Sequence, residues 1–136
     1  MKLIDQILKY PFFVILLSFL ISCQEVDDGK RQVVSPEEMK ELKALDTVQF
    51  IDVRTLKEFR NEHIKGAQNL VYDDDFKDKI DQLDKSKPVA VYCRTGRRSK
   101  ECSKILSDAG FKKIYELNGG ITKWKHVNFP TVQSND

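Results

Sequence analysis

The sequence predicts an α/β domain in which a parallel sheet carries helices on both faces. The first observation is a pair of short, nearly continuous apolar runs at residues 48–53 and 89–92, the pattern of parallel strands buried on both faces. The second is that segments with helical spacing of apolar residues alternate with such runs. The third is the shortness of the connections, which is usual where strands and helices alternate.

The first helix is expected to begin after Ser35. Ser35 is an N-cap residue, Pro36 suits the first helical position, and Glu38 completes a capping box. One face of this helix is expected to carry the apolar residues Met39, Leu42 and Leu45. Residues 24–32, before this helix, are polar and lack periodicity, so they indicate a short tether.

The strand at residues 48–53 is expected to pass directly into a second helix, because Thr55 and Glu58 form another capping box. Residues 67–70 are a short strand candidate. A third helix is expected to start at the aspartates of residues 73–75, whose charge suits a helix N-terminus. Its apolar positions are Phe76, Ile80 and Leu83.

A further strand begins after Pro88 and runs to Cys93, and a helix is expected to start near Arg98 or Ser99. Helical spacing places four residues on its apolar face, namely Cys102, Ile105, Leu106 and Ala109. Gly110 suits the left-handed residue that follows a helix. These signals predict a strand, a loop and a helix in direct succession.

The last part of the domain is expected to add one strand and one helix. Residues 113–117 have the composition of a strand, and residues 119–120 are a glycine pair typical of a turn. Ile121 and Trp124 form the apolar side of a last short helix.

The N-terminus has the pattern of a targeting segment. Basic residues at positions 2 and 9 precede an apolar run at residues 11–22, as in a signal peptide. A permanent transmembrane anchor is the weaker interpretation, because a spanning helix needs about 20 apolar residues. The run closes with Leu-Ile-Ser-Cys at residues 20–23, which resembles the lipobox of bacterial lipoproteins.

The lipobox interpretation makes Cys23 the lipidated N-terminus of the mature chain. The alternative is an ordinary secretory peptide with a chance cysteine. We therefore expect a signal peptide at 1–22, a lipidated tether at 23–32, one domain at 33–132 and a tail at 133–136. The expected location is the bacterial cell envelope, facing the periplasm, and Gln24 after the cysteine favours the outer membrane.

The composition narrows the possible partners. The net charge of +2 over 136 residues gives no argument for nucleic-acid binding. Two histidines and the two cysteines other than Cys23 are too few, and too irregularly spaced, for a zinc site. We expect no metal, no cofactor and a monomer.

Cys93 is the candidate nucleophile, because it lies between a strand and a helix, where sites form in parallel sheets. Such a loop turns backbone N–H groups inward and adds the partial charge of the helix N-terminus, which stabilises an anion. Arg94, Arg97 and Arg98 add cations, and together these effects lower a cysteine pKa from about 8.5 to about 4–7. Gly96 is expected to let the loop close around the sulfur without a Cβ in the way.

The alternative for Cys93 is a buried structural thiol, but core thiols avoid nearby arginines. Because Cys93 is placed in a loop, its replacement by serine is expected to change stability little. Cys102 lies on an apolar helix face, where packing is the favoured role, with a disulfide to Cys93 or a resolving thiol as alternatives.

Three segments of the chain are, in order, "IDVRTLKEFRNEHIKGAQNL", "VYCRTGRRS" and "ELNGGITKWKHVNFPTV". They resemble the three signature segments of the rhodanese family of sulfurtransferases. The resemblance covers about residues 33–132. It implies a rhodanese-like α/β fold with a five-stranded parallel sheet, and a Cys93 that carries a persulfide. The active-site loop then comprises Cys93, Arg94, Thr95, Gly96, Arg97 and Arg98, with Ser99 after it.

The chain departs from the family pattern in two places. Residues 62–67 read Glu-His-Ile-Lys-Gly-Ala, where many members have Gly-His-Ile-Pro-Gly-Ala. Asn128 and Phe129 stand where a glycine often precedes the late proline, and asparagine tolerates the left-handed conformation. His63 is expected to be structural. Asp52 and Arg54 are expected to be an internal polar pair that positions the loop.

The resemblance implies that Cys93 takes sulfur from an anionic donor such as thiosulfate and passes it to cyanide or a thiol. Arg94 and Arg98 are expected to bind the donor, and Arg97 to face solvent. A rhodanese-fold phosphatase or arsenate reductase is the other enzyme class. The phosphatase pattern Cys-x5-Arg fails, because Ser99 occupies the arginine position. A non-catalytic binding module or a periplasmic persulfide carrier is the third possibility.

Overall fold

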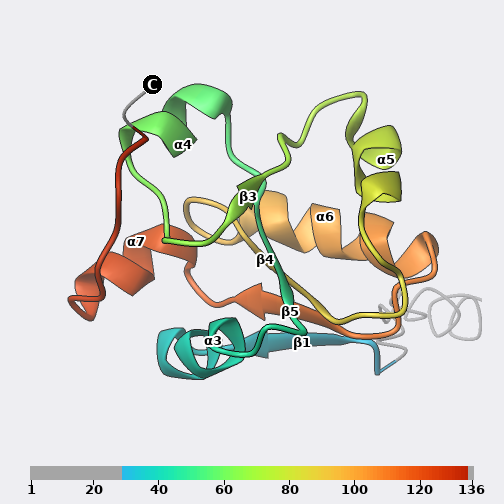
Figure 1. The fold of residues 1–136 in the computed structure, drawn as a ribbon, viewed down its shortest axis with the longest axis horizontal. Helices are drawn as coiled ribbons and strands as arrows, with labels where there is room; N and C mark the ends of the chain where they lie inside the picture. Colours follow the sequence, from blue (N-terminus) through green and yellow to red (C-terminus); the bar gives the residue numbers. More distant parts are fainter. Residues whose placement is uncertain (1–28, 135–136) are drawn as a thin grey trace, which may run out of the picture.

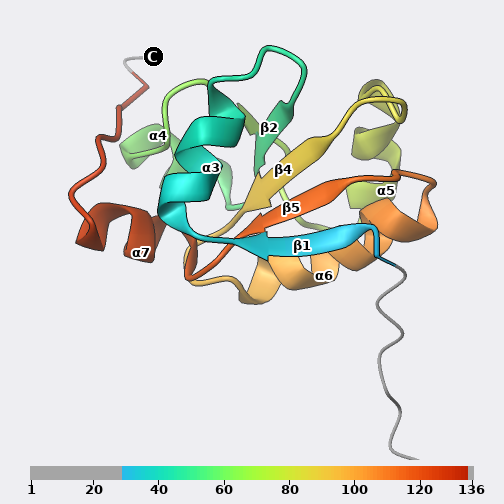
Figure 2. The same ribbon diagram turned by 90° about the horizontal axis from the view of Figure 1, so that it is seen from below.

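The computed structural model describes residues 29–134 and has a central five-stranded sheet. All strands are parallel and their order is β1-β5-β4-β2-β3. The strands are β1 (Arg31–Val34), β2 (Gln49–Asp52), β3 (Gln68–Asn69), β4 (Val89–Tyr92) and β5 (Ile114–Leu117). Figures 1 and 2 show the sheet between two layers of helices. The predicted α/β fold with a five-stranded parallel sheet is confirmed.

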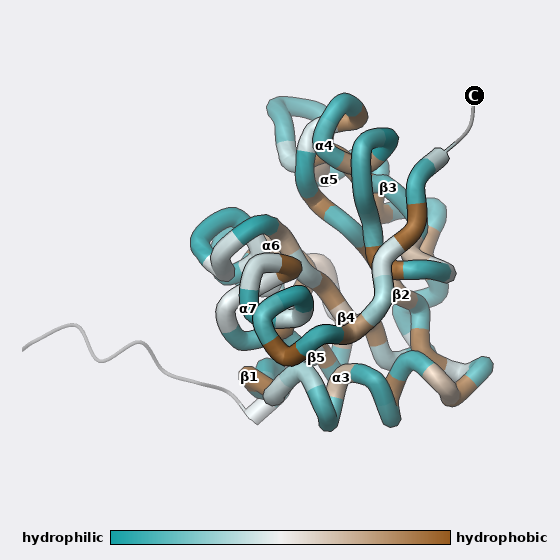
Figure 3. Tube along the Cα trace, turned by 90° about the vertical axis from the view of Figure 1, so that its left-hand side faces the viewer, coloured by the Kyte–Doolittle hydropathy of each residue, from teal (hydrophilic) through white to brown (hydrophobic). Residues whose placement is uncertain are grey.

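The helices pack on both faces of the sheet, and each face has its own apolar cluster. They are α3 (Pro36–Lys43), α4 (Leu56–Asn61), α5 (Phe76–Lys79) with the 3₁₀ turn η2 (Ile80–Gln82), α6 (Arg97–Asp108) and α7 (Gly120–His126). One cluster joins α5, η2 and α6 to the sheet, and the other joins α3 and α7 to it. Hydrophobic positions lie along the central strands, with hydrophilic positions on outer helix turns (Figure 3).

Two helices start where the sequence places their caps. The Ser35 hydroxyl accepts from the Glu38 amide at the start of α3, and the Glu38 carboxylate accepts from the Ser35 amide. Thr55 and Glu58 make the same reciprocal pair at the start of α4. Each box satisfies two amides that have no partner within the helix.

Other boundaries differ from the sequence-based prediction. Leu45 is 52% exposed, because α3 ends at Lys43 and Leu45 lies in the turn beyond it. The predicted third helix is two short turns, α5 and η2. Helix α6 begins at Arg97, earlier than expected, because Gly96 already caps it.

The sequence analysis did not predict β1, because it assigned the residues up to 32 to a tether. Arg31, Gln32 and Val33 are polar or exposed, and the strand forms because β5 supplies a parallel partner along its length. The predicted domain boundary at residue 33 thus falls inside β1. The predicted signal peptide, Cys23, Gln24 and the last tail residues lie outside the described residues. Within 29–134, no helix has the length and apolar character needed to cross a bilayer.

Candidate active site

Cys93 directly follows β4, at the edge of the sheet where the parallel strands end. Its side chain continues the alternation of Val89 and Val91 and enters the cluster beneath α6. The residue is only 1% exposed. The expectation that the thiol lies outside the packed interior was therefore wrong, because the strand alternation carries into the first residue of the loop.

The sulfur of Cys93 receives polar contacts from the loop that follows it. The Gly96 amide donates to Sγ over 3.1 Å, and the Ser99 hydroxyl oxygen lies 3.4 Å from Sγ. The same hydroxyl lies 3.1 Å from the Gly96 carbonyl oxygen, to which it can donate. The loop thus curls around the sulfur from Thr95 to Ser99 and turns its amides inward.

The pKa of Cys93 lies below the ordinary thiol value. Burial is the largest influence and raises the pKa, but hydrogen bonds from the Ser99 hydroxyl and from the amides of Ser99, Gly96 and Thr95 outweigh it. The groups that lower the pKa most are therefore amides and a hydroxyl, and not the arginine side chains that the sequence suggested. The arrangement favours an anion on sulfur.

Gly96 serves the loop through its backbone angle. Its φ is +108°, a conformation that residues with a Cβ rarely adopt. A Cβ at this position would meet the Gly119 amide nitrogen at 3.8 Å, an ordinary contact. The expected reason, relief of crowding around the sulfur, is thus replaced by a left-handed turn that aims the Gly96 amide at Sγ.

Arg98 is held by an acidic partner that the sequence analysis did not pair with it. Its guanidinium donates to both carboxylate oxygens of Glu58 over 2.8 and 2.9 Å. This bond is the main cause that lowers the pKa of Glu58 to about 2. Because Glu58 also caps α4, the pair fastens the Cys93 loop to α4.

The three loop arginines therefore differ in their surroundings. Arg94 lines the cleft described below, and among residues 29–134 no carboxylate pairs with it. Arg97 is exposed at the first position of α6. Arg98 already donates to Glu58 from both of its terminal guanidinium nitrogens. Of the two arginines expected to bind the donor, the geometry favours Arg94.

Asp52 and Arg54 do form a buried polar pair, at the end of β2. The Arg54 guanidinium donates to both Asp52 oxygens, with a shortest distance of 2.7 Å, and also to the Glu62 carbonyl oxygen over 2.6 Å. The Tyr92 hydroxyl accepts from the Ile64 amide and bonds to Asp52. The pair thus braces the segment after α4, which forms one wall of the cleft, rather than the Cys93 loop itself.

Helix α7 is seated on the backbone of the Cys93 loop. The amides of Ile121 and Thr122 donate to the carbonyl oxygens of Cys93 and Arg94 over 2.9 and 3.1 Å. A Cβ at Gly120 would lie 2.5 Å from these backbone atoms. Gly120 is therefore required for the close approach, a role that the sequence analysis did not separate from an ordinary turn.

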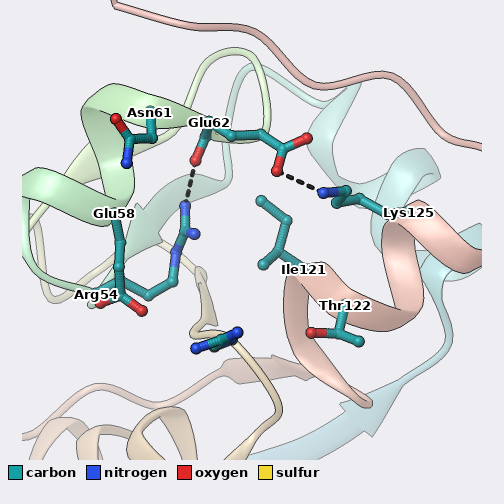
Figure 4. Close-up of a pocket in the computed structure, with 8 residues that line it drawn as sticks. Arg54, Glu58, Asn61, Glu62, Ile121, Thr122 and Lys125 are labelled. Carbon is teal, nitrogen blue, oxygen red and sulfur yellow. Dashed lines mark hydrogen bonds and ion pairs between the residues drawn. The ribbon is translucent and has the colours of Figure 1, made fainter.

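A cleft of about 390 Å³ opens between α4 and α7. Its lining comes from the two helices, the segments after β2 and α4, and the Cys93 loop, and comprises Arg54, Glu58, Asn61, Glu62, Arg94, Ile121, Thr122 and Lys125. Figure 4 shows Glu62 and Lys125 bridging the rim, and their charged atoms are 2.6 Å apart. Because Glu58 and Glu62 are both paired with cations, Arg94 leaves the cleft with an excess of positive charge.

Cys102 and His63 are both buried. Cys102 is fully buried on α6, and burial raises its pKa. Neither Cys93 nor Cys102 forms a disulfide. The His63 ring stacks on Phe59, with its Nδ1 2.8 Å from the Phe59 carbonyl oxygen. Residues 29–134 contain no cluster of side chains suited to a metal ion.

Fold and site together define a class: parallel α/β domains with a cysteine in an amide-lined loop between a strand and a helix. The sequence of residues 35–127 matches the Rhodanese-like domain family. The chain belongs to this family, as its three signature segments indicated.

Two relatives and one solved structure illustrate the similarity. The chain is 32% identical to the thiosulfate sulfurtransferase GlpE of Shewanella oneidensis, over 70% of this chain and 93% of that protein. It is 36% identical to the tRNA uridine(34) hydroxylase of Cytophaga hutchinsonii, over 76% of this chain but only 35% of that protein. The Alr3790 protein from Anabaena superimposes with a TM-score of 0.69 at 25% identity, over 76% of this chain and 94% of that one.

Proposed function

We propose that this protein is a sulfurtransferase that moves sulfane sulfur from an anionic donor such as thiosulfate to a nucleophilic acceptor through a persulfide on Cys93. The observation that carries the proposal is the cradle around Sγ, in which the Gly96 amide and the Ser99 hydroxyl face the sulfur. This cradle favours the thiolate, which is the attacking form of a cysteine. The similarity to GlpE supports the choice of donor.

In the first step the Cys93 thiolate attacks the outer sulfur of thiosulfate, S₂O₃²⁻. A new S–S bond forms, the S–S bond of thiosulfate breaks, and sulfite leaves as SO₃²⁻, so Cys93–S–S⁻ remains. In the second step cyanide attacks the outer sulfur, leaves as SCN⁻ and restores the Cys93 thiolate. The loop amides that stabilise the thiolate also suit the persulfide anion, and the two steps give ping-pong kinetics.

Arg94 is proposed to hold the sulfonate end of thiosulfate. It lines the cleft and, within the described residues, has no carboxylate partner. Arg98 is proposed to act through position, by holding the loop against Glu58. The excess positive charge of the cleft favours an anionic donor over a neutral one.

A dedicated persulfide carrier is the second candidate. The observation in its favour is that Cys93 is 1% exposed, so that a bulky acceptor needs a surface fitted to the surrounding loop to reach the sulfur. A carrier would accept sulfur from thiosulfate but release it only to its partner. Rapid turnover with cyanide separates the enzyme from the carrier.

Intact mass measurement tests the proposal directly. The protein is incubated with thiosulfate, desalted and weighed before and after addition of cyanide. We expect a gain of one sulfur atom that cyanide removes, and no gain in Cys93→Ser. If Cys93→Ser gains sulfur to the same extent, the site is elsewhere.

We also propose that Cys23 is lipidated and anchors the domain to the cell envelope, facing the periplasm. The support is the Leu-Ile-Ser-Cys sequence at the end of the apolar run. Full-length protein is expected to incorporate labelled fatty acid in bacteria, and Cys23→Ala to lose the label. Labelling that persists in Cys23→Ala would show that the anchor is not at this residue.

A further inference from the structure

A second, more open hollow adjoins the cleft along α7. It measures about 630 Å³ and is lined by Thr95, Gly119, Thr122, Lys123, Lys125 and His126, a surface that we call the α7 groove. Thr122 and Lys125 line both the cleft and the α7 groove. Figure 4 shows these two side chains on α7 at the cleft side. The two hollows thus form one continuous surface that starts at the Cys93 loop.

The charge of the α7 groove is one-sided. Its lining contains two lysines and a histidine but no carboxylate. Lys125 is bonded to Glu62 on the cleft side. Lys123 is exposed, and no carboxylate of residues 29–134 forms an ion pair with it. A surface of this kind attracts negatively charged groups and is weakened by salt.

The burial of Cys93 limits how an acceptor reaches the sulfur. Cys93 is 1% exposed, and the next residue, Arg94, lines the cleft between α4 and α7, so a large acceptor has to present its thiol on a narrow, extended segment. The residues next to that thiol then lie over the rim, where Thr122 and Lys125 lead into the α7 groove. The groove is thus placed to contact the flanks of the thiol.

We propose that the α7 groove docks an acidic peptide segment that carries the acceptor thiol of a partner protein. The sulfur transfer in this proposal rests on the proposed function of Cys93, whereas the docking does not. In the transfer, the sulfur of the partner thiol R–SH attacks the outer sulfur of Cys93–S–S⁻. The bond between the two sulfurs of the persulfide breaks, the thiol proton passes to the transferred sulfur to give R–S–SH, and Cys93 leaves as the thiolate.

The docking is tested by binding alone. The probe is a fluorescent heptapeptide with a central serine flanked by two glutamates on each side, and its control has glutamines instead. Full-length protein in nonionic detergent is titrated into each peptide at low salt, and anisotropy is recorded. We expect the acidic peptide to bind more tightly, and Lys123→Glu to weaken its binding by about fivefold, as expected for a partly solvated charge contact.

Two further variants make the binding test specific. Lys112→Glu introduces the same charge on an exposed residue at the opposite edge of the sheet, where the chain enters β5. We expect it to leave peptide affinity within about twofold of wild type. Lys123→Gln removes the positive charge without adding a negative one and is expected to weaken binding less than Lys123→Glu. Equal affinity of the two peptides, or equal effects of Lys123→Glu and Lys112→Glu, would overturn the docking proposal.

Transfer is then measured with the same two peptides carrying a central cysteine. Persulfidated wild type is expected to pass sulfur faster to the acidic peptide, Lys123→Glu to lose that preference, and its rate with cyanide to stay unchanged. Protein that binds the acidic peptide but never becomes persulfidated would contradict the proposed function while supporting the docking surface. Persulfidated protein that transfers sulfur equally to both peptides would overturn the docking proposal instead.

Discussion

The end of β4 and the apolar face of α6 present two buried cysteines whose pKa values are shifted in opposite directions. Cys93 and Cys102 are 1% and 0% exposed and belong to the same apolar cluster. Burial raises the pKa of both. At Cys93 the Ser99 hydroxyl and the loop amides reverse that effect, whereas at Cys102 burial dominates and the pKa is raised well above the ordinary value.

The difference shows that burial by itself does not decide whether a cysteine is reactive. The side chain of Cys102 lies on a helix whose amides are used within the helix, so few donors are free to face its sulfur. Cys93 lies where a strand has ended and α6 has not yet begun, so the amides of Thr95 and Gly96 are free to turn inward. The lowered thiol pKa of Cys93 thus depends on backbone amides that are left free to face its sulfur.

The strongest test of this comparison replaces each thiol in turn. Cys93→Ser is expected to reduce thiosulfate–cyanide turnover by at least about 10³-fold, because hydroxyl is a far weaker nucleophile than thiolate. Cys102→Ala is expected to retain most of the activity. Thiocyanate formation measures both. Loss of activity in Cys102→Ala with an intact fold would show that the second thiol takes part in the chemistry.

Removal of the Ser99 hydroxyl is expected to raise the pKa of Cys93, as burial does for Cys102. Ser99→Ala raises the pKa of the Cys93 thiol and lowers the rate of its reaction with iodoacetamide at neutral pH by about tenfold, the equivalent of about one pKa unit. Ser103→Ala is the matched control, because Ser103 is a buried serine on the same helix that bonds to Glu116 instead. Identical pH profiles for Ser99→Ala and wild type would refute this role.

Substitution of Arg94 is expected to weaken binding of the sulfur donor without changing the pKa of the Cys93 thiol. Arg94→Gln is expected to raise the KM for thiosulfate about fivefold and to leave the iodoacetamide pH profile unchanged, because amides and a hydroxyl set the thiol pKa. Arg97→Gln, at an exposed position on the same loop, is the control. A shift of the pH profile in Arg94→Gln would show that this arginine does lower the pKa of the Cys93 thiol.

The packing role of Cys102 predicts a change in stability without a change in chemistry. Cys102→Ala is expected to lower the free energy of unfolding by about 1 kcal/mol, comparable to the removal of one buried methyl group. Cys93→Ser is also expected to destabilise, because its sulfur contacts the same cluster. Urea unfolding of both variants measures the two effects, and unchanged midpoints would contradict the packing argument.

The smallest effect concerns acid stability. The folded-state pKa of Glu58 is about 2, below its ordinary value of 4.5, so its bond with Arg98 stabilises the fold above about pH 4.5, and this contribution is lost as the pH falls through 2. Glu58→Gln is expected to flatten that part of the stability curve by less than about 1 kcal/mol, because the pair is partly solvated. Glu38→Gln, in the other capping box, is the control. Equal dependence of stability on pH in the two variants would contradict a stabilising role for the bond between Glu58 and Arg98.

The features that the sequence predicted correctly depend on neighbours along the chain. Both capping boxes span three positions, and their side chains meet because of helix geometry alone. Asn128 adopts a φ of +59°, as its place in the pattern suggested. The position of Cys93 after β4 follows from the apolar run before it.

The features that were missed depend on contacts between distant segments. Glu58 and Arg98 are 40 positions apart, and their pairing requires α4 and α6 to meet over the Cys93 loop. The need for glycine at position 120 arises from the Cys93 and Arg94 backbone. Strand β1 has little apolar content and exists because β5 offers it an edge. Local periodicity contains no information on any of these partners.

The parallel sheet also decides how the domain can be attached to a surface for experiments. All strands start at one edge, so the chain enters at Arg31 on the side opposite the end of β4 that carries Cys93. The C-terminal segment instead runs back along α4, where the Ser134 amide donates to the Arg60 carbonyl over 3.1 Å. An affinity tag, bead or sensor chip linked ahead of β1 leaves the cleft accessible, whereas the same linkage after Ser134 crowds the cleft wall.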